Sequence, residues 1–395
     1  MSNRKIIVAG IVIGLAVSAS PILAQDQSAQ PSADQSQGQM VSIFVGGDVL
    51  TRAGQSYNAG DYQQAVQDYS LFILLNPTFG EAYHLRGLAY ARLNDLDLAL
   101  ADMNQSLDFP QASDQLTGTI YSDRALIYLQ QNDAEAALKD LEASITAAPD
   151  LPDPYSRRAR LYLLSGQYQD AVKDYDKLIE LTPDYSPAYA GRAFANTRLG
   201  NADQAVADYD HLIELDPSNS GAYAERAILK VGQQKYDAAL VDMNAAIKLQ
   251  PDDPSLYFQR GIVNVALNDQ TAAAADYLDW IRKQEIRSVD GDLLLPGESQ
   301  VLPMQQGLSY GLPFEAKLGQ KVTLTATGRE NSKTDPLIVL LDPDSKPIVA
   351  DDDSGGSYNS AIRDYVIPAD GTYTLVVSYA GGSPDGAVRV LLQVQ

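Results

Sequence analysis

Residues 152–185 read PDPYSRRARLYLLSGQYQDAVKDYDKLIELTPDY and contain the pattern that decides the fold of this chain. Apolar residues recur at intervals of three and four on both sides of the turn LLSGQ. This spacing predicts two amphipathic helices joined by a turn in which glycine accepts a positive φ. Pro183, at position 32 of the stretch, would end the second helix and set the angle to the segment that follows. The stretch therefore predicts a helical hairpin.

The same hairpin recurs with a period of 34 residues. Seven units begin at residues 46, 80, 118, 152, 186, 220 and 254, and only the second is longer, by four residues. Position 8 is always small and position 20 is always alanine, as expected where two helices cross closely: Ala53, Gly87, Ala125, Ala159, Ala193, Ala227 and Gly261, then Ala65, Ala99, Ala137, Ala171, Ala205, Ala239 and Ala273. Because one hairpin cannot bury its own apolar face, the units are expected to stack into an α-solenoid.

This pattern, with tyrosine at position 4 of six units and proline near each unit's end, resembles the tetratricopeptide repeat over residues 46–287. The resemblance implies seven helix-turn-helix repeats whose first helices line a concave face, with positions 2, 5, 9 and 12 pointing into it. It also implies that the protein binds a protein or peptide segment and is not an enzyme.

The repeat departs from its best-known form at position 7, where leucine is common. That position is arginine in every unit and position 23 is aspartate in every unit: Arg52, Arg86, Arg124, Arg158, Arg192, Arg226 and Arg260, with Asp68, Asp102, Asp140, Asp174, Asp208, Asp242 and Asp276. An arginine ladder that grips an anionic ligand is one interpretation. The strict pairing favours an ion pair between the first and second helix of each unit, since the arginine fork suits a carboxylate.

The N-terminal 45 residues are predicted to lie outside the repeats. Residues 1–24 have a basic start, an apolar stretch of 12 residues and a small residue at Ala24, which predicts a signal peptide cleaved near Ala24. Residues 25–45 begin with a segment rich in Gln, Ser and Asp and are predicted to be a disordered leader. The protein is therefore expected to be periplasmic or secreted, with no membrane span in the mature chain.

The C-terminal residues 288–395 change to short alternating segments rich in Gly, Pro, Thr and Val, which predicts an antiparallel β-sandwich. The candidate strands are 300–305, 308–317, 321–327, 337–341, 362–367, 372–379 and 388–394. The segments LLDPDSKPIVADDD and IPADGTYTLVV resemble the bacterial pre-peptidase C-terminal domain. That resemblance implies a β-sandwich of secreted proteins that assists secretion, localisation or substrate contact.

Composition and isolated motifs argue against several kinds of chemistry. The net charge of −22 opposes nonspecific attraction to nucleic acid, and the lack of cysteine excludes disulfides and thiolate sites. The match of residues 307–311 to a nucleophile elbow lacks a histidine later in the chain, so Ser309 is not expected to be catalytic, and no cofactor is expected. Asp351 and Asp353 are weak calcium candidates, with a solvated turn as the alternative.

The expected docking surface is a mostly apolar stripe at positions 5 and 9 of the first helices. It comprises His84, Leu88, Leu126, Arg160, Phe194, Ile228, Phe258 and Ile262. These side chains either bind a partner or complete the packing between neighbouring first helices. The function expected from the sequence is an exported interaction scaffold, and the alternative is a substrate-recruiting or localising subunit of an exported protease or cell-wall enzyme.

We predict that export removes residues 1–24. Intact-mass measurement of the protein purified from the cell envelope or the medium is expected to give a chain that begins at Gln25. A mass that still includes Met1 to Ala24 would contradict a cleaved signal.

Overall fold

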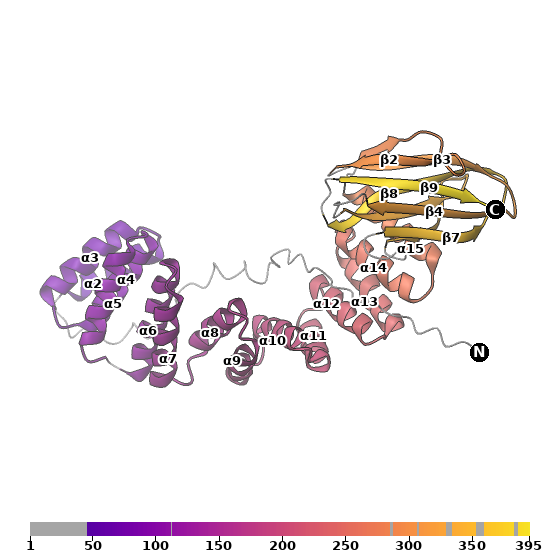
Figure 1. The fold of residues 1–395 in the computed structure, drawn as a ribbon. Helices are drawn as coiled ribbons and strands as arrows, with labels where there is room; N and C mark the ends of the chain where they lie inside the picture. The colour runs from indigo at the N-terminus through magenta and orange to yellow at the C-terminus, as the bar shows by residue number, and fades with distance from the viewer. Residues whose placement is uncertain are drawn as a thin grey trace. The chain divides into compact units, whose positions relative to one another are not determined.

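The computed structural model describes residues 46–111, 113–284, 287–305, 308–328, 334–352, 359–382 and 386–395. Within these ranges, fourteen helices are followed by nine strands, as Figure 1 shows. The predicted signal peptide, most of the predicted leader and the calcium candidate Asp353 lie outside the described residues. Among the described helices, none has both the length and the apolar character that crossing a membrane requires.

Each predicted unit is a pair of helices, and the two helices of a pair pack against each other. In chain order the pairs are α2 (Gly47–Asn58) with α3 (Tyr62–Leu75), α4 (Gly80–Arg92) with α5 (Leu96–Asp108), α6 (Asp114–Gln130) with α7 (Ala134–Ala147), α8 (Pro152–Leu164) with α9 (Tyr168–Leu181), α10 (Ser186–Leu199) with α11 (Ala202–Leu215), α12 (Ser220–Gly232) with α13 (Tyr236–Leu249), and α14 (Pro254–Ala266) with α15 (Gln270–Lys283). The predicted solenoid of seven hairpins is confirmed.

The turn inside each hairpin has the left-handed backbone that the sequence pattern predicted. Position 15 has a positive φ in all seven units, and it is Gly60, Asn94, Asn132, Gly166, Gly200, Gln234 and Asn268. Glycine adopts this conformation without strain and asparagine tolerates it. The turn geometry, and not glycine itself, is thus the constant feature.

The predicted arginine–aspartate pairs are confirmed in six units. In each of them the Nη2 atom of the arginine at position 7 lies 2.6 or 2.7 Å from Oδ1 of the aspartate at position 23 of the same unit. The six aspartates are 2–6% exposed, so the pairs are largely removed from water. The seventh predicted pair, Arg192 with Asp208, joins two compact units of the chain and stays a prediction.

The arginine also reaches back to the preceding unit. Its second terminal nitrogen donates to the side chain at position 25 of that unit, as Arg124 does to Asn104 at 2.7 Å and Arg226 to Asp210 at 2.6 Å. The tyrosine at position 4 adds another link, because its hydroxyl donates to the carbonyl of the preceding position-32 proline, for example Tyr155 to Pro149 O at 3.0 Å. One guanidinium therefore ties three helices from two units.

Two compact units divide the described chain between Gly200 and Asn201, that is, between α10 and α11. The first contains helices α2 to α10, and the second contains α11 to α15 together with all nine strands.

The strands form a two-sheet sandwich with one feature that the sequence did not predict. One sheet has the order β1 (Arg287–Asp290), β3 (Leu308–Ala316), β8 (Gly371–Gly382), β5 (Thr334–Leu341), β6 (Pro347–Asp351), and the other has the order β2 (Ser299–Met304), β9 (Gly386–Val394), β4 (Lys321–Gly328), β7 (Asn359–Val366). The described pairings are antiparallel except β1 with β3, which is parallel. Phe314, Leu324, Tyr373 and Val390 are among the buried residues of the core between the sheets.

Strand β5 is buried on both faces because the sandwich packs on the last hairpin. Ile338 and Leu340 point into the core between the two sheets, while the alternate residues Leu337 and Val339 join a second cluster with the last helices. Helix α15 contributes Trp280, among others, to that cluster, and Figure 1 shows the sheet lying against α14 and α15. The last repeat and the sandwich thus share one hydrophobic core.

Position 25 explains why the solenoid ends here. In the first six units this position is polar, and it is Ser70, Asn104, Glu142, Asp176, Asp210 and Asn244. In the last unit it is Leu278, which is 5% exposed and packs in the cluster shared with the sandwich. Since no arginine of an eighth unit needs an acceptor, an apolar residue stands where the polar partner would be. The sandwich occupies the place of the next repeat.

We predict that Arg124→Leu destabilises the protein by about 3–5 kcal/mol, because Asp140 would be left as an uncompensated buried carboxylate. Arg124→Leu combined with Asp140→Leu should recover most of that loss, since the double variant buries no charge. Urea denaturation of the four proteins measures the coupling, and additive losses would contradict it. Lys173→Leu is the control, because its pair with Asp170 is exposed and contributes little.

We also predict that Leu278→Asp separates the sandwich from the last repeat. Trp280 is the only tryptophan of the chain and is 8% exposed, so its fluorescence reports on this junction. Its emission should move to longer wavelength and the unfolding midpoint should fall. Val241→Asp, at an exposed position of α13, should change neither. An unchanged emission spectrum in Leu278→Asp would contradict the shared core.

Candidate functional site

The first helices of neighbouring repeats contact one another, α4 with α6, α8 with α10 and α12 with α14. We call the surface formed by these helices the inner face. Seven of the eight predicted docking residues are partly exposed: Leu88, Leu126, Arg160, Phe194, Ile228, Phe258 and Ile262. The eighth, His84, is 4% exposed.

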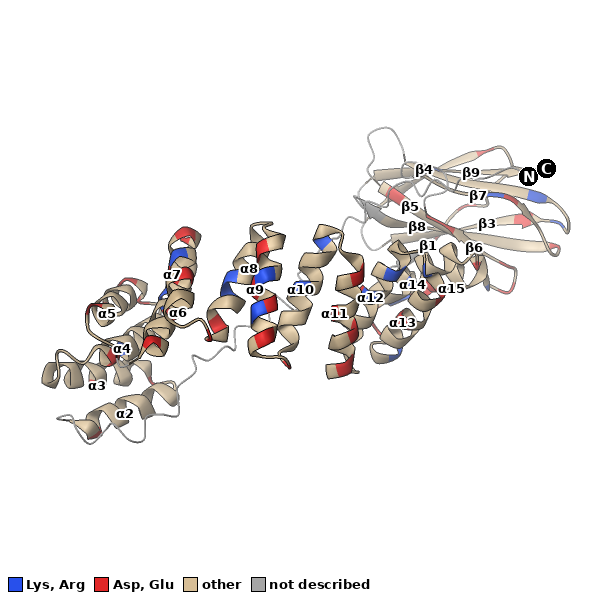
Figure 2. Cartoon of the chain, turned by 90° about the horizontal axis from the view of Figure 1, so that it is seen from below, with Lys and Arg blue, Asp and Glu red and all other residues tan. Residues whose placement is uncertain are grey.

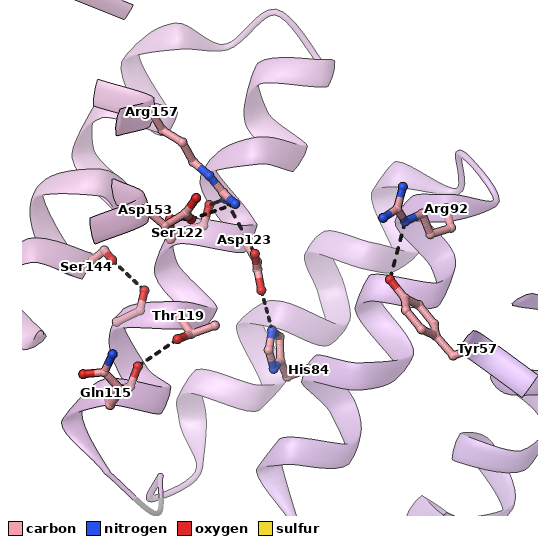
Figure 3. Close-up of polar contacts among 11 residues, drawn as sticks. Tyr57, His84, Arg92, Gln115, Thr119, Ser122, Asp123, Ser144, Asp153 and Arg157 are labelled. Carbon is pink, nitrogen blue, oxygen red and sulfur yellow. Dashed lines mark hydrogen bonds and ion pairs between the residues drawn. The ribbon is translucent and has the colours of Figure 1, made fainter. Parts of the chain in front are cut away.

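His84 belongs to a polar network that joins three consecutive repeats. Its Nε2 atom lies 2.9 Å from Oδ2 of Asp123 on α6, so Nε2 carries the hydrogen that is shared with the carboxylate. The guanidinium of Arg157 on α8 lies 3.6 Å from the other oxygen of Asp123, and its Nη2 atom lies 2.7 Å from Oδ2 of Asp153. Figure 3 shows the chain of contacts from His84 to Arg157.

This network is built from groups that already have partners. Arg157 also donates to the carbonyl of Ser122 at 2.6 Å, and the hydroxyl of Ser122 donates to Asp153 at 2.9 Å. Burial raises the pKa of Asp153, while Arg157 and the Ser122 hydroxyl oppose the shift. The network therefore fixes the first helices of repeats two, three and four relative to each other, and it places His84 inside the packing of the inner face.

The exposed part of the predicted stripe lies in repeats four and five. On α10 the ring of Phe194 meets the ring of Tyr168 at 6.3 Å in a T-shaped contact, and the guanidinium of Arg198 lies 5.4 Å from the centre of the same tyrosine ring. On α8, Leu164 is 72% exposed and stands one helical turn after Arg160. We call Arg160, Leu164, Tyr168, Phe194 and Arg198 the Arg–Phe face.

Three residues of this face were not predicted from the sequence. The analysis considered positions 5 and 9 of each unit, whereas Leu164 and Arg198 occupy position 13 and Tyr168 occupies position 17. The helical period gives the missing signal, because positions 9 and 13 are four residues apart and share one side of a helix.

The last part of the stripe is engaged by the junction with the sandwich. The ring of Phe258 lies 5.1 Å from the indole of Trp280 and 5.4 Å from the ring of Tyr277. The hydroxyl of Tyr277 in turn lies 3.3 Å from Oδ2 of Asp352. Burial raises the pKa of Tyr277 well above its ordinary value, so this phenol stays protonated. Phe258 therefore supports the shared core, and its replacement would test stability together with binding.

The sandwich holds the remaining candidates from the sequence. Ser309 is 1% exposed inside strand β3, and Gly307 of the same motif lies outside the described residues. Oδ2 of Asp351 accepts a hydrogen bond from the backbone N–H of Ala361 at 2.7 Å. Within the described ranges no group of three or more His, Asp or Glu side chains is arranged to hold a metal ion. Calcium binding at Asp351 and Asp353 stays an untested prediction.

A cavity of about 330 Å³ opens beside strands β1, β2 and β3. Its lining includes Asp290, Asp292, Gln300 and Tyr310. The amide of Gln300 donates to the carbonyl of Leu293 at 3.1 Å, and the hydroxyl of Tyr310 donates to a backbone carbonyl at 2.5 Å. Its polar donors are thus used within the fold.

Comparison with known proteins supports the repeats. Models described as tetratricopeptide repeat match residues 56–115, 118–151, 152–185, 186–219 and 225–285. No curated protein matches the chain. The resemblance of the strands to the pre-peptidase C-terminal domain stays a prediction.

Several solved structures share the fold. A repeat-containing protein from Cytophaga hutchinsonii is 15% identical with a TM-score of 0.54, over 60% of this chain and 96% of that one. A tetratricopeptide repeat protein from Parabacteroides merdae is 22% identical with a TM-score of 0.42, over 60% and 93%. YrrB, described as a TPR protein with an unusual peptide-binding site, is 20% identical with a TM-score of 0.43, over 48% and 94%. At such identities the likeness concerns the fold alone. With repeat models that match from residue 56 to residue 285, the chain belongs to the tetratricopeptide repeat proteins.

Proposed function

We propose that this protein is an exported interaction scaffold that binds a peptide or protein segment on its inner face and performs no chemistry of its own. The observation that carries the proposal is the Arg–Phe face, where an exposed leucine, a half-exposed phenylalanine and two arginines lie on two neighbouring first helices. Aromatic and arginine side chains are the residue types that most often anchor protein interfaces.

The rigidity of the surrounding helices supports binding at this face. Arg158 and Arg192 hold α8 and α10 by bonds to Asp174 and Asp176, at 2.7 and 2.5 Å. A surface whose backbone is already fixed loses little conformational entropy when a partner docks. The first helices thus offer a preorganised platform.

Export is the second element of the proposal and rests on residues 1–24 of the sequence. In this interpretation the sandwich stays fixed to the last repeat and presents a second surface at a fixed distance from α14 and α15. Such an arrangement suits a scaffold that connects a bound segment to another site in the envelope or outside the cell.

We predict that Phe194→Ala weakens capture of the native partner by about 1–2 kcal/mol, because it removes an aromatic anchor from the centre of the Arg–Phe face. The partner is first identified by crosslinking and pull-down from the native envelope, and its affinity for each purified variant is then measured. Ile228→Ala tests whether the binding surface continues along α12.

The control is Val241→Ala, which removes an exposed apolar side chain from a second helix. It should leave the affinity unchanged, and circular dichroism should show equal helix content in all variants. Equal affinity of Phe194→Ala and the unsubstituted protein would refute binding at this face.

A further inference from the structure

The charge of the Arg–Phe face is opposite to that of the whole chain. The chain has 29 basic and 51 acidic residues, whereas helices α8 and α10 together contain five arginines and one aspartate. The single aspartate is Asp153, at the start of α8, and Arg157 holds it. Figure 2 shows the basic residues of α8 and α10 in blue. A local reversal of sign in a strongly acidic protein selects for an acidic partner.

Three of the five arginines already serve the fold. Arg157 belongs to the network with Asp123 and Asp153, and Arg158 and Arg192 bind Asp174 and Asp176. The arginines on the Arg–Phe face are the other two, Arg160 and Arg198.

Arg198 is placed to bind a carboxylate. It is exposed, and among the described residues its interaction is with the ring of Tyr168, 5.4 Å away. Stacking occupies one face of the guanidinium plane, while the N–H donors lie around its edge, where a carboxylate can accept two of them. The aromatic ring thus holds the arginine in place without using its hydrogen-bond donors.

Apolar surface lies between the two cations. Arg160 and Leu164 share one side of α8, and Phe194 and Arg198 share one side of α10, since each pair is four residues apart. Tyr168, which contacts both residues of α10, follows directly after the turn that ends α8. The face therefore presents apolar groups flanked by positive charge.

We infer that the Arg–Phe face binds an internal acidic segment of another protein, in which side-chain carboxylates flank one or more large apolar residues. The inference rests on the proposed function and adds the chemistry of the ligand. The carboxylates bind Arg160 and Arg198, and the apolar side chain packs on Phe194 and Leu164.

The test uses fluorescence anisotropy with the full mature chain and a labelled peptide, Asp-Leu-Phe-Glu repeated three times and amidated at its C-terminus so that only side-chain carboxylates are present. We expect saturable binding that weakens with salt and is at least about tenfold tighter than binding of the same peptide with lysine in place of each acidic residue. Equal binding of the two peptides, or no binding of the acidic one, would overturn the inference.

Charge variants then locate the site. Arg198→Gln and Arg160→Gln should each weaken the acidic peptide about tenfold, and Arg198→Glu should shift the preference toward the lysine peptide. Lys173→Gln, which removes an exposed charge from the second helix of repeat four, is the matched control and should have no effect. If Arg198→Glu leaves the preference unchanged, the acidic segment does not bind here.

Failure of this inference and failure of the proposed function give different results. A native partner whose capture depends on Phe194 but not on Arg160 or Arg198 would preserve the interaction face and exclude the acidic ligand. A partner insensitive to all three residues would exclude the face itself.

Discussion

The arginine at position 7 is the interaction on which the solenoid depends. Within a repeat it binds the buried aspartate of the second helix through two nitrogens, and it also contacts the side chain at position 25 of the preceding repeat. Burial of one partner alone would be strongly unfavourable, so the pair forms only when both helices are in register. Because the same group also reaches the previous hairpin, folding of one repeat favours the correct placement of the next.

Much of this arrangement could be predicted from one sequence because the period is strict. The frame of 34 residues located the helices and turns, and the matched columns of arginine and aspartate predicted the pairs. The contact to position 25 was not predicted, since that column varies among Ser, Asn, Asp, Glu and Leu. A column of mixed polar residues carries no periodic signal, although its one apolar member, Leu278, marks the place where the repeats end.

The docking of the sandwich could have been inferred from residues 337–341, which read LIVLL. A strand buried on one face alternates between apolar and polar residues, whereas a continuous apolar run indicates burial on both faces. The position of His84 could not be inferred in this way. Its partner Asp123 lies 39 residues away and occupies position 6, which is leucine, arginine, glycine or glutamate in other repeats. Only the spatial arrangement of adjacent first helices brings the two together.

The junction at α15 also determines how copies of this chain can associate. A stack of hairpins has two different ends, and exposed complementary ends can join head to tail and grow into open filaments. Here the C-terminal end is covered by a sheet whose Leu337 and Val339 pack on the last hairpin, so it offers no site for the first repeat of another copy. Lengthening by duplication is restricted in the same way. An added hairpin after α15 would have to displace the sandwich, whereas a hairpin inserted between two earlier repeats would meet the same arginine and the same polar acceptor on either side.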